Sequence, residues 1–536
     1  MKIYQQFLLI LCLCGLTFFA HLGEFTPDLM ESRNFITARE MLNDGNWISP
    51  TMNGEPRLEK PPFPTWLTAL SAKFGGGLDD PFTMRLPAAV SATLMVFFFF
   101  GFCRELSKEK YLPLLGAAIM ATSLMVIQEG RTNSWDIHAH AYMLGSIWML
   151  LRGWNKGGWL NYAAAGLLMG LSILSKGPVP LYVLWLPFML AYGFGYRNGV
   201  LKRYWKQTVL VFVFGLLVGF SWQIYIYFEL PEVMEYVINK ETASWGGRHV
   251  RPFYFYLHFP VFIGIWSVFV IASFFYKYAK KRVNRFGNYR FALLWILISV
   301  FLLSVIPTKK ERYLLPVMIP MALMATYMVY AIIKAYWQKS DTKRDRIILR
   351  IFALIIGVAA AALPGVAWFM KDQYFSSMLF IVGVTIIGLL GIRELYLIKS
   401  NNAPQLVVNA MIIIAFFTGL LTPQLADIHY QYPDFKDVAA IREIPELQGL
   451  PIVADAQDLN MKLVWSVGDK VGYIDFSSPN WESKLPAVFI TNAPVDGRLP
   501  KEVLEKIELK DYGIYDYFRD DSKYKAHVYY ITNYEN

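Results

Sequence analysis

Charged side chains gather in short segments between long apolar runs of this sequence, and their types suit the handling of a phosphate group. Lys and Arg bind phosphate oxygens through charge-assisted hydrogen bonds, and a carboxylate beside them can serve as a general base. These groups predict transfer from a phosphate-bearing donor, with charge stabilisation of the departing phosphate as the main catalytic effect. The candidate phosphate-binding residues are Arg33, Lys60, Arg131, Lys176, Arg248, Arg251, Lys310 and Arg312, and the candidate acids are Glu31, Asp28 and Asp136.

Asp28 and Glu31 are three residues apart, so they share one face if this segment is helical. One interpretation is a pair of neighbouring carboxylates, one of which acts as the base. The other is a capping box, in which Asp28 begins a helix and Glu31 completes the cap. Arg33 favours a functional role for Glu31, because a phosphate-binding pocket also contains Arg–carboxylate pairs. Both interpretations stay open at the level of sequence.

Lys60 and Asp136 each allow two interpretations as well. Prolines at 61, 62 and 64 stiffen the backbone after Lys60. A cation held in this way near the membrane surface suits a lipid phosphate, although an interfacial lysine also extends its ammonium towards headgroups for solvation alone. Asp136 opens a predicted helix, so it is either a residue of the site or an N-cap.

The composition predicts a polytopic α-helical membrane protein. Of the 536 residues, 55% are hydrophobic and only 17% are charged, whereas a soluble domain is about 25% charged. This excludes a soluble multidomain enzyme and a disordered chain. The formal net charge is +10, and basic cytoplasmic loops explain it better than a nucleic-acid partner does. The three cysteines have no spacing typical of a disulfide framework or a zinc site.

Apolar runs long enough to cross a bilayer recur along the chain. A spanning helix needs about 20 residues, and the runs predict about thirteen transmembrane helices. Basic residues collect in the short loops after the even-numbered spans, which places those loops and the N-terminus in the cytoplasm. An odd number of spans then puts the C-terminus outside. The predicted spans are 5–22, 84–103, 111–128, 138–152, 160–175, 178–195, 207–228, 255–276, 291–307, 312–333, 347–370, 377–397 and 405–423.

Two segments outside the spans are long enough to have structure of their own. Residues 23–83 form the first periplasmic loop, with a helical stretch over 30–42. Residues 424–536 predict a small soluble α/β domain that follows the transmembrane catalytic domain 1–423. The predicted strands of this tail are 451–454, 470–476, 487–491 and 527–532, and the predicted helices are 434–443, 457–466 and 500–507.

Short motifs follow one another through the outer loops. They are Arg39-Glu40-Met41-Leu42, Asn53-Gly54-Glu55-Pro56, Glu59-Lys60-Pro61-Pro62, Lys176-Gly177-Pro178, His249 with Arg251-Pro252-Phe253, and Arg312-Tyr313-Leu314-Leu315-Pro316. In sequence and order they resemble the motifs of the aminoarabinose transferase family. That family belongs to the GT-C glycosyltransferases, as do the protein O-mannosyltransferases. Thirteen helices followed by a periplasmic domain is also the layout of the family.

The resemblance implies a membrane glycosyltransferase. It would transfer a hexose or pentose, with inversion, from an undecaprenyl-phosphate donor on the periplasmic face of a bacterial inner membrane. Relatives have an Asp-Glu dyad before the Arg that Arg33 matches. Here Met30 replaces the first acid, so Glu31 is the expected base and Asp28 the alternative.

The resemblance assigns further roles to matching positions. Lys60 matches a lysine that binds the donor phosphate, and Asp136 matches an acid of the site. Glu59 and His249 match positions that can hold a divalent metal, such as zinc, between two loops. Two protein ligands are few for zinc, which usually has three or four, so we expect any such metal to be structural.

The acceptor and two alternative functions stay open in the sequence. The acceptor is lipid A, another glycan or a protein. A lipid-linked glycan polymerase or ligase would share the donor. A lipid or sugar transporter would show internal repeats and charges near the midplane of the membrane, whereas the charges here concentrate at one face. The expected location is the inner membrane, with a cytoplasmic N-terminus and a periplasmic C-terminal domain.

Overall fold

The computed structural model of the chain describes residues 1–247, 249–369, 378–430, 436–517 and 525–534. The chain divides into two compact units. The first unit contains 1–22, 58–64 and 85–424, and the second contains 23–57, 65–84 and 425–536. The second unit therefore includes most of the segment predicted as the first periplasmic loop, in addition to the C-terminal tail.

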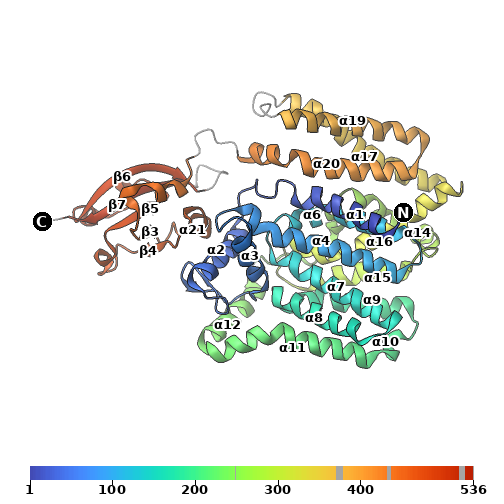
Figure 1. Cartoon of the computed structure of the whole chain (residues 1–536), viewed down its shortest axis with the longest axis horizontal. Helices are drawn as coiled ribbons and strands as arrows, with labels where there is room; N and C mark the ends of the chain where they lie inside the picture. Colours follow the sequence, from blue (N-terminus) through green and yellow to red (C-terminus); the bar gives the residue numbers. More distant parts are fainter. Residues whose placement is uncertain (248, 370–377, 431–435, 518–524, 535–536) are drawn as a thin grey trace. The chain divides into compact units, whose positions relative to one another are not determined.

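The first unit is a bundle of helices, many of which run side by side (Figure 1). Its elements are α1 (Ile3–Cys14), η1 (Gly15–Phe19), α4 (Pro81–Leu106), α5 (Leu112–Ala121), α6 (Leu124–Gly130), α7 (Trp135–Lys156), α8 (Trp159–Lys176), η2 (Leu181–Trp185), α9 (Leu186–Tyr196), α10 (Val200–Arg203), α11 (Trp205–Glu229), α12 (Pro231–Gly247), η3 (Phe253–Trp266), α13 (Ser267–Ser273), α14 (Tyr276–Val283), α15 (Tyr289–Val305), η4 (Glu311–Leu314), α16 (Leu315–Trp337), α17 (Lys343–Phe369), α19 (Met378–Ser400) and α20 (Ala403–Tyr430).

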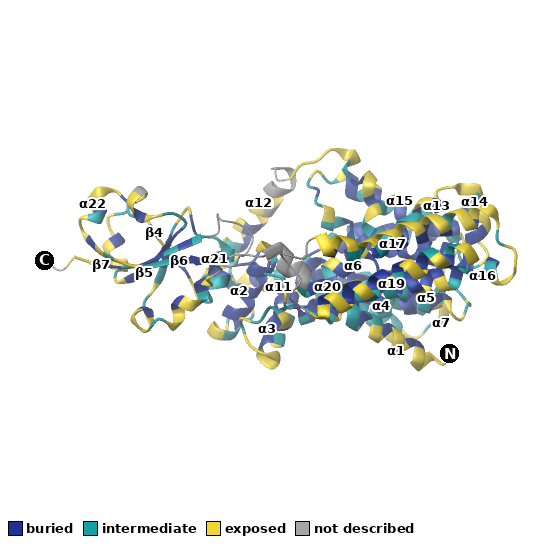
Figure 2. Ribbon diagram, turned by 90° about the horizontal axis from the view of Figure 1, so that it is seen from above, coloured by how far each residue is buried: buried dark blue, intermediate teal, exposed yellow. Residues whose placement is uncertain are grey.

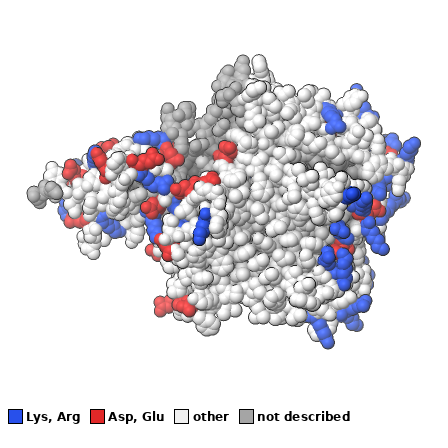
Figure 3. Space-filling model, viewed as in Figure 1, with Lys and Arg blue, Asp and Glu red and all other residues white. Residues whose placement is uncertain are grey.

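The helix α16 is buried along nearly all of its length, and Figure 2 shows many buried residues within the helices of the first unit. Helices at the edge, such as α11 and α17, bury one face and expose apolar side chains on the other. Exposed apolar faces of this kind are what a bilayer solvates. The broad middle surface of the first unit carries few charges in Figure 3, and Lys and Arg gather at one end.

Seven helices among the described residues are long and apolar enough to cross a membrane, and α5 and α6, bent by 62°, add an eighth if they form one span. Three further apolar helices are shorter, at Ile3–Phe19, Leu181–Tyr196 and Tyr289–Val305. Every predicted span overlaps a helix, and α7 and α8 take the places of the fourth and fifth spans. The polytopic helical fold is therefore confirmed, and the count of thirteen crossings stays a prediction.

The hairpin of α7 and α8 has a turn that only glycine makes without strain. Gly157 and Gly158 both have positive φ, at 72° and 87°, where other residues meet a steric penalty. The two helices pack along their length, and the Ser172 hydroxyl donates to the Ala139 carbonyl at 2.6 Å. This antiparallel pairing places the start of α7 beside the end of α8.

The second unit contains a mixed five-stranded sheet in the order β4-β3-β5-β7-β6. The neighbours of β3 are parallel to it, and the β5–β7 and β7–β6 pairs are antiparallel.

The elements of the second unit are α2 (Leu29–Asp44), β1 (Thr51–Met52), β2 (Glu55–Pro56), α3 (Phe63–Gly75), η5 (Val438–Glu443), η6 (Pro445–Leu447), β3 (Ile452–Asp455), α21 (Met461–Val467), β4 (Gly472–Ile474), η7 (Trp481–Lys484), β5 (Ala487–Thr491), η8 (Val495–Gly497), α22 (Lys501–Leu504), β6 (Ile507–Asp516) and β7 (Lys525–Asn533).

The four strands predicted in the tail are present, and one strand was missed. The predicted helix over 500–507 is wrong in its second half, because α22 ends at Leu504 and β6 begins at Ile507. The strand β6 alternates weakly between apolar and polar residues because it lies at the edge of the sheet, where only β7 pairs with it.

Part of the predicted first loop packs on the tail within the second unit. The guanidinium of Arg39 on α2 donates to the carbonyls of Val464 at 2.9 Å and Trp465 at 3.4 Å, at the end of α21. Asn53 exchanges two hydrogen bonds with the backbone of Val471, both 2.8 Å long. Residues separated by about four hundred positions thus share one core, which also contains Phe35.

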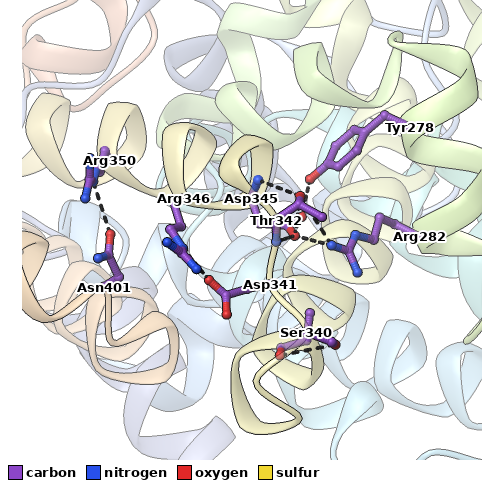
Figure 4. A network of polar contacts seen from close by, with 10 residues as sticks. Tyr278, Arg282, Ser340, Asp341, Thr342, Asp345, Arg346, Arg350 and Asn401 are labelled. Carbon is purple, nitrogen blue, oxygen red and sulfur yellow. Dashed lines mark hydrogen bonds and ion pairs between the residues drawn. The ribbon is translucent and has the colours of Figure 1, made fainter.

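A buried ion pair joins α14 to the start of α17 (Figure 4). Arg282 contacts Asp345, which is fully buried. Asp345 also accepts hydrogen bonds from the Tyr278 hydroxyl at 2.5 Å and from the Thr342 amide at 2.6 Å. A buried charge needs such partners because it has lost its water.

We expect Asp345→Ala to destabilise the protein by about 3–5 kcal/mol, because it leaves the Arg282 guanidinium buried and unpaired. Asp341→Ala is the matched control. It removes the pair with the half-exposed Arg346, which should cost less than about 1 kcal/mol. Thermal unfolding of the purified protein, followed by tryptophan fluorescence, measures both effects, and equal unfolding temperatures for the two variants would contradict this account.

Candidate functional site

The α7–α8 hairpin brings Asp136 and Lys176 together in the first unit. Asp136 is the second residue of α7, and Lys176 is the last residue of α8. The carboxylate and the ammonium form an ion pair. Each also lies at the helix end that favours its charge, since a helix N-terminus stabilises an anion and a C-terminus a cation. Local structure and pairing therefore both stabilise the two charges.

Asp136 is only 3% exposed, and several groups compensate its charge. His140 follows one turn later on α7, and its Nε2 atom lies 3.8 Å from the carboxylate, so it is a neighbour that forms no hydrogen bond with Asp136. Arg312 contributes a second nearby positive charge. The Lys176 ammonium also lies 4.8 Å from the centre of the Tyr313 ring, which is cation–π geometry. These contacts compensate the buried negative charge of Asp136.

A cavity of about 390 Å³ opens beside this ion pair. Its size is within the range of small-molecule sites. Charged residues occupy part of its wall, and most of the remainder is apolar, with side chains from α11, α12, α15 and the segments around Pro61 and Pro178. The lining residues are Leu58, Glu59, Lys60, Pro61, Asp136, His140, Lys176, Gly177, Pro178, Val179, Val183, Phe220, Trp222, Gln223, Met234, Val237, Ile238, Tyr256, Leu303, Ile306, Thr308 and Tyr313. Such a wall suits an amphiphile with a charged head.

The proline-rich segment 58–64 supplies Lys60 to this cavity. Leu58, Pro61 and Pro62 are buried, so the segment is anchored on both sides of Lys60. Phe63 also makes an edge-to-face contact with Tyr142 of α7, with ring centres 5.6 Å apart. Three of the candidate residues, Lys60, Asp136 and Lys176, thus line one cavity, whereas Glu31 and Arg251 are not among its lining residues.

Lys309 links the loop that contains Arg251 to its own loop, 306–310. Its ammonium donates to the carbonyls of Ile306 at 2.6 Å and Arg251 at 3.1 Å. Burial lowers the pKa of Lys309. The backbones of Val250 and Thr308 form a bridge beside it. This lysine therefore acts as a structural link between loops.

Other predicted cations have different surroundings. Arg251 is exposed, with its guanidinium 5.9 Å from the Phe255 ring centre. The backbone of Lys310 is hydrogen-bonded to the Tyr256 hydroxyl. Arg131 donates to the carbonyls of residues 17 and 21 and so fixes the end of the first helix. Arg248 lies outside the described residues.

Three of the predicted residues, Asp28, Glu31 and Arg33, belong to the second unit. Asp28 is the N-cap of α2, and its carboxylate accepts from the amides of Met30 and Glu31 at 2.7 and 2.8 Å. Glu31 is buried and accepts from the Asp28 amide at 3.2 Å, which completes a capping box. The capping box is therefore confirmed. A catalytic role for either acid stays a prediction.

The residues predicted to hold a metal do not fit one. The Glu59 carboxylate accepts from the Lys240 ammonium of α12 at 2.9 Å, and His249 is exposed. Across the part of the chain that the structure describes, no group of three or more His, Cys, Asp or Glu residues is placed to bind a metal ion. We therefore derive no step through a metal.

Sequence reasoning missed several residues of the cavity. His140 has a signal in the sequence, because it is four residues after Asp136 and shares its helix face. Tyr313 directly follows Arg312. The apolar wall has no such signal, since Phe220 or Met234 looks like any other residue of an apolar helix.

Comparison with known proteins gives a consistent set of relatives. A family profile described as dolichyl-phosphate-mannose-protein mannosyltransferase matches residues 59–222. An undecaprenyl phosphate-alpha-4-amino-4-deoxy-L-arabinose arabinosyl transferase of Pseudomonas fluorescens is 27% identical over 353 residues. The transferase of this name from Pectobacterium atrosepticum is 25% identical over 417 residues, or 74% of this chain and 71% of the relative. The chain is similar in sequence to aminoarabinose transferases. The resemblance predicted from the motifs is confirmed.

The fold is also that of an aminoarabinose transferase. ArnT from Cupriavidus metallidurans in the apo state matches with a TM-score of 0.72, over 98% of this chain and 97% of that one, at 16% identity. The ArnT structure bound to undecaprenyl phosphate matches with a TM-score of 0.68 at 15% identity. The match to the Pseudomonas relative covers 63% of this chain and 57% of that protein.

Asp136 and Lys176 should be coupled energetically. We expect Asp136→Asn and Lys176→Met each to destabilise the protein by about 3–5 kcal/mol, because each leaves the partner charge buried. The double variant should lose clearly less than the sum, since it leaves no unpaired charge. Thermal unfolding of the four proteins measures the coupling, and additive losses would contradict the pairing.

Proposed function

We propose that this protein is an inverting glycosyltransferase that uses an undecaprenyl-phosphate-linked sugar as donor. The observation that carries the proposal is the cavity with Lys60, Asp136 and Lys176 on its wall and apolar side chains around most of the remainder. A polyprenyl-phosphate donor has the same division between a charged head and an apolar chain. The names of the relatives and the lipid in the second ArnT structure support this donor.

In this proposal the lysines bind the donor phosphate. Lys60 and Lys176 provide positive charge from two independent segments, and Asp136 holds the Lys176 ammonium in place. The acceptor attacks the anomeric carbon, the bond from that carbon to the phosphate oxygen breaks, and undecaprenyl phosphate leaves. The cations stabilise the negative charge that develops on the leaving oxygen.

The proton of a hydroxyl acceptor must pass to a base. Glu31 stays the predicted base, with Asp28 as the alternative. An acceptor phosphate, as on lipid A, would already be ionised and would need no base. Lipid A, another glycan and a protein are the three acceptor classes under this proposal, and the site is proposed to face the periplasm of a bacterial inner membrane.

The proposed activity can be tested with purified protein, an undecaprenyl-phosphate-linked pentose and one acceptor of each class, which are lipid A, a glycan with free hydroxyl groups and a protein. Glu31→Gln should lower transfer to a hydroxyl acceptor by about 10²-fold or more. Lys60→Ala should weaken binding of undecaprenyl phosphate by about tenfold or more, because a charge-assisted hydrogen bond is lost. Lys206→Ala, at an exposed position outside the cavity, is the control. Failure of the wild-type protein to bind the lipid or to transfer sugar would refute the proposal.

The proposed orientation is testable separately. We expect a reporter that is active only in the cytoplasm to be silent when fused after Asn536, and active when fused in the loop at Ser340, because basic residues surround that loop. Activity after Asn536 would reverse the predicted topology.

A further inference from the structure

A second cavity of the first unit lies at the other end of α15 from the candidate site. Leu303, near the end of α15, lines the first cavity, and Tyr289 and Arg290, at its start, line the second. The 17 residues of this helix separate its ends by about 24 Å. The second cavity has a volume of about 950 Å³ and has no part in the proposed transfer.

Cations from separate segments surround this cavity. They are Lys108 in the connection from α4 to α5, Lys280 on α14, Arg285 in the connection after α14, and Arg290 on α15. Among the described residues, none of the four has an ion-pair partner, and Lys280 donates only to the Tyr276 hydroxyl, at 3.0 Å. Their charges therefore add within one hollow.

The carboxylates nearby are already held by other groups. Glu109 is the one carboxylate among the described lining residues, and it accepts from the Tyr330 hydroxyl at 2.5 Å and from Lys334 at 3.1 Å. Asp345 is bound to Arg282 and Tyr278, as Figure 4 shows. Among the described lining residues, four cations thus stand against one carboxylate, and Tyr330 and Lys334 already hold that carboxylate.

The wall also has an apolar side. Arg290, Leu293 and Leu294 follow one another on one face of α15, with the cation at the helix start and the leucines one turn further in. Leu106 and Phe286 continue this apolar wall. A ligand in the cavity would meet cations at one side and apolar side chains at the other.

We propose that this cavity is a second binding site, which takes a phosphate-bearing anion. The phosphate contacts Lys280, Arg285 and Arg290, and the apolar wall accommodates whatever the phosphate is attached to. The headgroup of an anionic phospholipid and a soluble phosphate or pyrophosphate share this chemistry. Bound there, the anion would connect α14 to α15 and reduce the repulsion among their cations.

The test uses the full chain in nanodiscs of phosphatidylcholine with a minor fraction of phosphatidylglycerol. The cavity variant is Lys280→Gln with Arg285→Gln and Arg290→Gln. The control variant is Lys206→Gln with Lys277→Gln and Lys281→Gln, which removes the same charge from exposed positions that do not line the cavity. Native mass spectrometry measures retained phosphatidylglycerol, and calorimetry measures binding of inorganic pyrophosphate.

We expect the wild-type protein and the control variant to bind one of the two probes, and the cavity variant to bind it at least about tenfold more weakly. Loss of retained phosphatidylglycerol identifies a lipid headgroup, and loss of pyrophosphate binding identifies a soluble anion. Equal behaviour of the two variants, or no binding of either probe by the wild-type protein, overturns the proposal. Arg290→Gln alone repeats the test with a single substitution if the triple variant unfolds at a lower temperature.

Discussion

The buried ion pair between Asp136 and Lys176 is the interaction on which the candidate site depends. Removing two charges from water is unfavourable unless other groups replace the lost solvation. Here the α7–α8 hairpin does so by placing a carboxylate at a helix N-terminus and an ammonium at a helix C-terminus. The Tyr313 ring and the nearby charge of Arg312 add to this compensation. A charged wall can therefore exist beside the apolar side chains of one cavity.

The cations of the loops predicted to face the periplasm have distinct roles that their residue type does not reveal. Lys176 pairs with a carboxylate and lines the cavity. Lys309 and Arg131 instead donate to backbone carbonyls and hold loops and a helix end in place. A basic residue in such a loop is thus as capable of satisfying the backbone as of binding a ligand. A count of cations in the sequence alone therefore overestimates how many of them are available to bind phosphate.

The segment between the first two predicted spans also has a divided structure. Residues 58–64 belong to the first unit, whereas the flanking residues 23–57 and 65–84 belong to the second, together with the tail. The prolines that follow Lys60 restrict the backbone of this short segment. The side chains of Arg39 on α2 and Asn53 in the β1–β2 turn donate hydrogen bonds to backbone carbonyls of the tail. The tail is thus completed by residues that precede it by hundreds of positions.

The sequence by itself determined the helical membrane architecture, most strands of the tail and the family resemblance. Apolar runs and strand alternation are local patterns, and motifs such as Glu59-Lys60-Pro61-Pro62 are contiguous. The sequence also indicated Lys60, Asp136 and Lys176 as candidate site residues, because charged residues beside long apolar helices are easy to recognise. Only the tertiary structure decided that these three residues line one cavity. It also showed that the Glu59 carboxylate is paired with the Lys240 ammonium, and that α2 packs against α21. Such pairings join residues distant in sequence, and their energies depend on burial and direction, which a linear pattern does not contain.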